Sequence, residues 1–185
     1  MNLWQLPKQA TIGGKTYGIY ADFRDVLQIV GYLDDPALPV WLRWKIALRL
    51  FYDGPIPYEY QKEAMDYLEE FLCCGRQGAQ STKRLDWKLD SDLILSDVNK
   101  VACCEIRELP FVHWWTFLAW FHGIGDGQLC TLVSIRDKLR RGKKLEGWEK
   151  DYFRQNKDRV LLRPALSPGE QAQKQALEEI LRRRV

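Results

Sequence analysis

Two histidines, His113 and His122, are the side chains in this sequence best suited to acid–base chemistry near neutral pH. A catalytic pair or a shared metal ion needs both imidazoles to face the same point. At about 100° per residue, positions nine residues apart on one helix lie on opposite faces. We therefore expect two histidines that are hydrogen-bonded at the ends of a buried helix, and no catalytic residue.

The five cysteines form two adjacent pairs and one isolated residue, namely Cys73, Cys74, Cys103, Cys104 and Cys130. A zinc site usually places two to four residues between paired ligands, so that both thiolates can face one ion. Adjacent helical cysteines point about 100° apart, so we interpret these residues as small buried hydrophobes and expect no metal. An odd count without a secretion signal indicates reduced thiols in the cytosol.

A run of cations near the C-terminal end could contact phosphates. It consists of Arg136, Lys138, Arg140, Arg141, Lys143 and Lys144. The run contains no aromatic side chain on which a base could stack, so we expect no strong nucleic-acid binding. Two other interpretations stay open, namely a solvated helix end favoured by the helix dipole and a surface for an acidic protein.

Charge is distributed unevenly along the chain. Residues 131–185 hold fifteen Lys and Arg against eight Asp and Glu, whereas residues 1–130 hold thirteen against seventeen. The basic end could therefore attract an acidic partner or the rest of the chain.

The sequence lacks the motifs of the common enzyme classes. It has no phosphate-binding loop, no serine elbow and no His-Glu metal helix, so we expect neither catalysis nor a cofactor.

The composition of the chain, with 185 residues of which 46% are hydrophobic and 29% charged, is typical of one globular domain. No segment resembles a signal peptide or reaches the length of a membrane span, so we expect no membrane partner.

Hydrophobic periodicity predicts a mainly α fold. Gly13-Gly14 lies between alternating apolar residues and predicts a β-hairpin over residues 10–20. Asp22 is the expected N-cap of the first helix and Gly31 its expected end. Six or seven helices are predicted, over about residues 23–30, 39–52, 57–74, 91–102, 111–122, 129–141 and 145–162.

A break between Pro164 and Pro168 divides the chain. We expect a helical domain with its N-terminal hairpin over residues 1–162, and a linker with a C-terminal amphipathic helix over residues 163–185. The apolar stripe of this last helix is thin, so we expect it to dock weakly or to stay free until a partner binds. The stripe consists of Ala172, Ala176, Leu177, Ile180 and Leu181.

The segment from Phe111 to His122 is apolar on nearly every face, so it must be buried in the fold or in a partner. One stripe consists of Trp114, Phe117, Leu118 and Phe121, whereas Trp115 and Trp120 lie on other faces. We therefore assign partner binding to these two tryptophans, to three arginines of the basic run and to the apolar residues of the tail. The predicted residues are Trp115, Trp120, Arg136, Arg140, Arg141, Leu177, Ile180 and Leu181.

This aromatic segment resembles the His-Trp-Trp signature of a phage protein family named after "gene product fifteen". The signature here is Phe111-Val112-His113-Trp114-Trp115-Thr116-Phe117-Leu118-Ala119-Trp120-Phe121-His122-Gly123. Other elements resemble the family in the same order, and they are Ile12–Tyr17, Asp22–Arg24, Leu85–Trp87 with Asp90–Asp92, and Val133–Arg136. The resemblance covers residues 10–162. The chain departs from the family at Cys103–Leu109, where members tend to have a Tyr-Gly-Ile-Asp-Leu-like turn.

Members of this family are encoded in phage tail modules, usually beside the genes for the tail-assembly chaperone and the tape-measure protein. The resemblance thus implies a tail-morphogenesis protein, acting as a chaperone or chaperone extension that binds the tape-measure protein. The neighbouring tail-assembly chaperone is the second expected partner, and self-association stays open. The expected location is the host cytoplasm or also the virion tail. Two alternative functions are a structural component of the mature tail and a nucleic-acid-binding phage regulator.

Overall fold

The computed structural model describes residues 4–75, 85–162 and 169. Within them the chain forms one two-stranded sheet, one short 3-10 turn and eight α-helices, which confirms the mainly α fold with an N-terminal hairpin. The predicted tail helix lies outside the described residues. The elements are β1 (Gln9–Ile12), β2 (Lys15–Gly18), α1 (Phe23–Leu33), α2 (Val40–Phe51), η1 (Tyr58–Tyr60), α3 (Gln61–Leu72), α4 (Ser91–Ala102), α5 (Trp114–His122), α6 (Gln128–Arg140), α7 (Gly147–Gln155) and α8 (Lys157–Val160).

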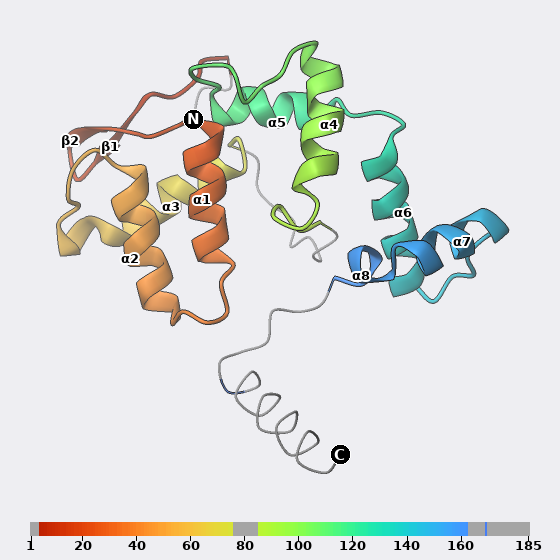
Figure 1. Cartoon of the computed structure of the whole chain (residues 1–185). Helices are drawn as coiled ribbons and strands as arrows, with labels where there is room; N and C mark the ends of the chain where they lie inside the picture. The colour runs from red at the N-terminus through yellow and green to blue at the C-terminus, as the bar shows by residue number, and fades with distance from the viewer. Residues whose placement is uncertain (1–3, 76–84, 163–168, 170–185) are drawn as a thin grey trace, which may run out of the picture.

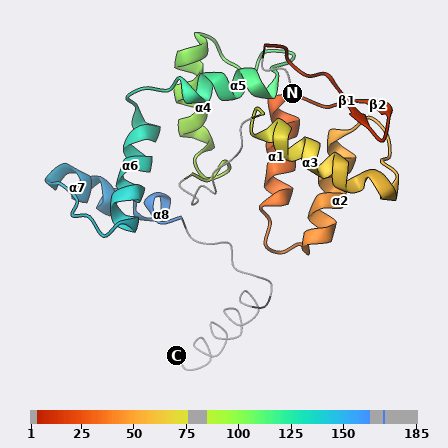
Figure 2. The same ribbon diagram turned by 180° about the vertical axis from the view of Figure 1, so that it is seen from behind.

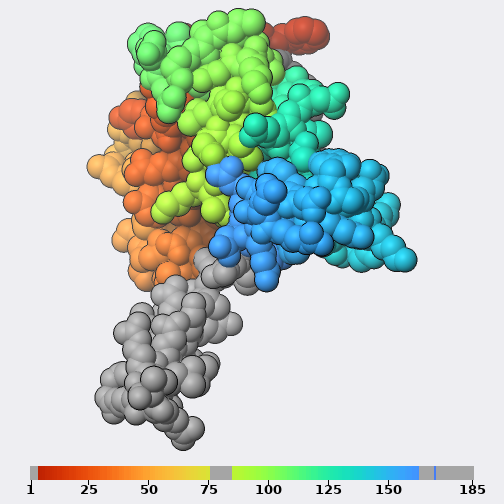
Figure 3. Space-filling model, turned by 45° about the vertical axis from the view of Figure 1, so that its right-hand side comes forward, coloured from red at the N-terminus to blue at the C-terminus, as the bar shows by residue number. Residues whose placement is uncertain are grey.

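The elements gather in two groups joined through α4 and α5. The hairpin, α1, α2 and α3 lie at one end, and α6, α7 and α8 lie at the other (Figures 1 and 2). α1 packs beside α2, whereas α4 contacts both α5 and α6. In Figure 3 the blue surface of α7 and α8 lies beside the yellow-green surface of α4.

The hairpin forms where the two glycines predict it. Gly13 and Gly14 have φ angles of 55° and 76°, the left-handed conformation that a two-residue turn requires. The strands pair antiparallel, with Ile12 opposite Lys15, and bury Ile12 and Tyr17 against the helices. The Gly13 backbone N–H donates to the Glu63 carboxylate of α3, so the turn is held against that helix.

The first helix begins at the predicted cap and ends later than predicted. The Asp22 carboxylate accepts a hydrogen bond from the Arg24 backbone N–H at 3.0 Å. Gly31 was expected to end the helix, but α1 continues to Leu33 and is capped by Asp34. The Asp34 backbone N–H donates to the Val30 carbonyl, so the helical hydrogen-bonding pattern continues past the glycine.

The aromatic helix α5 begins at Trp114, three residues after its predicted start. His113, just before the helix, is extended, and a backbone bridge pairs it with Asp22 at the start of α1. The Phe23 N–H donates to the Val112 carbonyl, and the Trp114 N–H donates to the Ala21 carbonyl. These pairings reach across about ninety residues of sequence, so local periodicity could not predict them.

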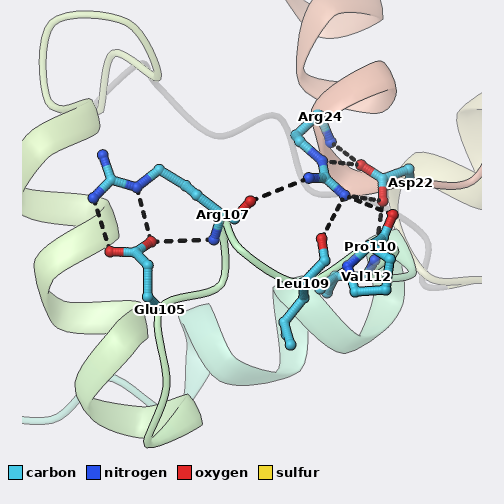
Figure 4. Close-up of polar contacts among 7 residues, drawn as sticks. All are labelled: Asp22, Arg24, Glu105, Arg107, Leu109, Pro110 and Val112. Carbon is cyan, nitrogen blue, oxygen red and sulfur yellow. Dashed lines mark hydrogen bonds and ion pairs between the residues drawn. The ribbon is translucent and has the colours of Figure 1, made fainter.

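An arginine on α1 organises the turn between α4 and α5, where the sequence departs from the family pattern. The Arg24 guanidinium pairs with Asp22 at 2.7 Å and also donates to the carbonyls of Arg107, Leu109 and Pro110 (Figure 4). Asp22 in turn accepts from the Val112 N–H at 2.9 Å. The Cys103–Leu109 segment therefore has a defined geometry, held by contacts from a helix distant in sequence.

The other end of the molecule is held by a buried ion pair. The Arg136 guanidinium donates to both carboxylate oxygens of Asp90, at 2.6 and 2.8 Å. Its remaining N–H groups donate to the carbonyls of Val160 and Arg159. One arginine on α6 thus joins the N-cap of α4 to the end of α8.

Candidate functional site

Two of the predicted partner-binding residues are enclosed by the fold. Trp115 is 7% exposed, and its indole N–H donates to the Phe71 carbonyl at 2.9 Å. Arg136 is also 7% exposed, and its guanidinium donates hydrogen bonds to the Asp90 carboxylate and to the Val160 carbonyl. The contact surfaces of both side chains are therefore used within the chain, which leaves little of either side chain open to a partner.

The other predicted partner residues differ in position. Trp120 is half-buried and packs against the core. Arg140 and Arg141 are exposed, and both pair with Asp137, at 3.0 and 2.8 Å. The three tail residues of the prediction, Leu177, Ile180 and Leu181, lie outside the described residues.

The rest of the basic run is largely balanced by neighbouring carboxylates. Lys138 lies 2.6 Å from the buried carboxylate of Glu149 and 3.8 Å from that of Glu146. In the part of the chain that the structure describes, Lys143 and Lys144 form no ion pair, and both are exposed. The run is thus split between a buried structural arginine and a solvated helix end, and does not form one continuous basic face.

The two histidines have different environments. His113 is 3% exposed and caps α5, because its Nδ1 accepts from the Trp115 N–H at 3.1 Å and its Nε2 lies 3.0 Å from the Pro7 carbonyl. This arrangement requires the neutral tautomer that carries its proton on Nε2. His122 ends the helix and is exposed, so the expectation of a buried histidine holds for His113 and is wrong for His122.

Stability should fall as the pH falls through the range in which His113 titrates. Burial lowers the pKa of His113 below 6.5, and nearby Lys8 lowers it further, against the opposing hydrogen bond to Pro7. The unfolded chain therefore binds the proton more readily, so stability present above about pH 6.5 is lost as the pH falls toward the folded-state pKa.

This pH dependence is measurable by denaturant unfolding between about pH 7.5 and 5.5, above the range in which carboxylates titrate. His113→Asn keeps a side-chain cap for α5 but removes the titrating group, so its stability should change less over this range than that of the wild type. The control is His122→Asn at the exposed end of the same helix, which should keep the wild-type slope. A wild-type slope in His113→Asn would contradict the prediction.

The cysteines are placed at the surface, contrary to their interpretation as buried hydrophobes. Cys73, Cys103, Cys104 and Cys130 are exposed and Cys74 is intermediate, all as free thiols. Most of them lie at helix ends, where side chains reach solvent. Across residues 4–75 and 85–162 no group of three or more metal-ligating side chains is close enough to hold an ion.

A hollow of about 450 Å³ between the end of α3 and α5 brings a thiol and an imidazole to one place. Cys73 and His122 both line it, together with Leu72, Leu118 and Ala119. No hydrogen bond joins Cys73 to His122 within the described residues. Among the described residues, the Cys73 thiol therefore lacks the contact with His122 by which a base activates a nucleophilic thiol.

An apolar open surface lies on α2 and was not predicted. Trp41, at the start of this helix, is 66% exposed, and Val40 beside it is 63% exposed. A hollow of about 560 Å³ adjoins them, which we call the α2 groove. It is lined by Trp41, Leu42, Lys45, Ile46, Leu48, Arg49, Leu50, Gly54, Pro55, Ile56 and Gln61.

Two parallel rows of side chains form the helical wall of the α2 groove. Leu42, Ile46 and Leu50 are spaced one turn apart and make a continuous apolar row. Trp41, Lys45 and Arg49 follow the same spacing and make the neighbouring row. The segment Gly54–Ile56, which turns away from the end of α2, provides the opposite wall.

Among the described residues, the two cations of the α2 groove have no ion-pair partner. Lys45 and Arg49 are both exposed, and neither forms an ion pair or hydrogen bond with another residue that the structure describes. Arg43, by contrast, points to the other side and donates to the carbonyls of Leu38 and Leu33. The groove thus combines an apolar floor with two exposed positive charges along one edge.

The α2 groove escaped the sequence-based prediction because α2 is apolar on more than one face. The helical period places Trp41, Trp44, Leu48 and Phe51 on one apolar stripe, which favours their burial together. In the structure Leu48 and Phe51 are buried with Ala47, whereas Trp41 is exposed. Nine apolar residues in a twelve-residue helix exceed what one buried face needs, and this surplus could have indicated a second contact surface.

The architecture is that of a small, mainly α domain with an open, apolar, helix-lined groove. The family model of the Bacteriophage Gp15 protein matches residues 4–162, and the chain belongs to that family. No curated protein and no solved structure gives a significant match. Within the described residues, no helix has both the length and the apolar character needed to cross a membrane.

Proposed function

We propose that the protein is a phage tail-morphogenesis factor that binds the tape-measure protein through the α2 groove, without catalysis and without a cofactor. Membership of a phage protein family supports the setting. The single observation that carries the binding role is the exposed apolar groove beside Val40 and Trp41. The neighbouring tail-assembly chaperone is the second partner in this proposal.

The α2 groove suits a helical partner. An amphipathic helix presents apolar residues at i, i+3, i+4 and i+7, which match a row of side chains one turn apart. A long helical protein exposes such stripes, and they promote aggregation when they are uncovered. Covering them until the tube assembles would keep the partner soluble, which is the role of a chaperone. Assembly would take place in the host cytoplasm.

Co-expression with the tape-measure protein of the same phage should keep that protein soluble, and the two should co-purify. Trp41→Ala should abolish most of this co-purification, because it removes a large exposed aromatic anchor from the groove. The matched control is Trp148→Ala, since Trp148 is also exposed, at 56%, but lies on α7. Both variants should keep the wild-type melting temperature.

Removal of residues 164–185 provides a further arm of the same experiment. We expect it to weaken the protection of the tape-measure protein more than it lowers the melting temperature. If the tape-measure protein stays insoluble with every form, including co-expression with the neighbouring chaperone, the proposal is wrong. Detection of the protein in purified virions would then favour a structural component of the tail.

A further inference from the structure

We infer that the α2 groove selects a helix whose apolar stripe is flanked by acidic residues. This inference deepens the proposed function, because it specifies the chemistry of the helix that the same groove takes. It is carried by the placement of two exposed cations, Lys45 and Arg49, which pair with no described residue, beside the apolar row of α2.

The length of the groove sets the length of the ligand. Leu42 and Leu50 are eight residues apart on one helix, which corresponds to about 12 Å at 1.5 Å per residue. A ligand helix that covers this row needs apolar side chains over roughly two to three turns. Trp41 extends the apolar surface at the N-terminal end of α2, and Ile56 closes it from the opposite wall.

The charged edge sets the composition of the ligand. Lys45 and Arg49 are one turn apart and stand in the row next to Ile46 and Leu50. No acidic side chain of residues 4–75 or 85–162 lines the α2 groove, so the charges that these residues present to a docked helix along this edge are positive. Two acidic residues three or four positions apart on the ligand would face the two cations together, because that is the spacing of neighbours on a helix.

Charge selects among ligands more than it strengthens binding. An exposed ion pair contributes little to the free energy of binding. A cation of the ligand placed against Lys45 and Arg49 would instead be repelled by them and would lose part of its hydration. The apolar row then supplies most of the affinity, and the edge rejects basic amphipathic helices. We expect the two effects together to give roughly tenfold discrimination between acidic and basic helices at low salt.

Two synthetic peptides of about 18 residues, long enough for partial helicity, serve as probes. They share one apolar stripe and differ only in having Glu or Lys at the flanking positions. Binding to the full chain is measured by fluorescence anisotropy at low and high salt. The test variant is Lys45→Glu/Arg49→Glu, and the matched control is Lys143→Glu/Lys144→Glu, which changes the net charge equally at an exposed site outside the groove.

The wild-type chain and the control should prefer the Glu peptide by roughly tenfold, and salt should reduce this preference. The groove variant should prefer the Lys peptide. Equal binding of both peptides, binding of neither, or a Glu preference that survives Lys45→Glu/Arg49→Glu would overturn the inference.

Two other occupants are tested in the same assay. Tighter peptide binding after removal of residues 164–185 would assign the α2 groove to the tail of this chain, and a dimer lost in Trp41→Ala would assign it to a second copy. Either result overturns the inference.

Peptide discrimination without co-purification of the tape-measure protein would refute the proposed function alone, whereas co-purification without discrimination would refute only the acidic preference.

Discussion

Arg136→Met should lower the free energy of unfolding by about 3–5 kcal/mol, because it leaves the buried carboxylate of Asp90 without its cation. Asp90 is 0% exposed, and its two oxygens take up both Nη groups of the arginine. The same substitution removes the hydrogen bonds to the carbonyls of Arg159 and Val160, so α8 loses one of its attachments, while the Arg159–Asp92 ion pair remains. Denaturant unfolding at neutral pH measures the loss.

The control for this substitution is Arg140→Met on the exposed side of the same helix. Arg140 pairs with Asp137 at the surface, where an ion pair contributes about 0–1 kcal/mol. The double variant Asp90→Asn/Arg136→Met removes both charges and should be more stable than Arg136→Met alone. Equal stabilities for Arg136→Met and Arg140→Met would show that the pair is solvated and contradict the buried arrangement.

Trp114→Ala should lower the free energy of unfolding by about 3–5 kcal/mol, because it leaves a large cavity in the aromatic core. Trp114 is 3% exposed, stacks on Phe117 with ring centroids 5.6 Å apart, and contacts Trp87 edge-on. Its indole N–H donates to the Leu72 carbonyl at 3.2 Å, so the substitution also removes a link between α5 and α3.

The matched control is Trp148→Ala, at an exposed tryptophan of α7, which should change stability by no more than about 0.5 kcal/mol. Chemical denaturation of both variants provides the comparison. If Trp114→Ala were as stable as the wild type, the aromatic face of α5 would be exposed, and the signature segment would belong to the binding surface.

These two predictions separate the residues that build the fold from those available to a partner. The His-Trp-Trp segment serves the core, because His113 caps α5 and both tryptophans donate to carbonyls at the end of α3. The α2 groove lies elsewhere and consists of residues outside that signature. Its variants should therefore affect binding without the loss of stability expected for Trp114.

Local signals in the sequence determined the elements. Gly13-Gly14 predicted the hairpin, because only a left-handed turn closes two strands in two residues. Asp22 marked the start of α1, because a short acceptor side chain satisfies a free N–H at a helix terminus. Apolar periodicity located the helices to within a few residues, except that the helix predicted over 145–162 is divided into α7 and α8. The resemblance of residues 10–162 placed the chain in its family.

Tertiary structure alone decided which of the similar side chains are buried. Trp41 and Trp115 both lie on helices that are apolar on several faces, yet the first is exposed and the second is enclosed. Arg136 belongs to a run of cations in the sequence, but it is buried in an ion pair with Asp90, which is 46 residues away along the chain. Periodicity describes one helix at a time, whereas burial depends on which other helix covers each face. For that reason the helices could be predicted from the sequence, but the α2 groove could not.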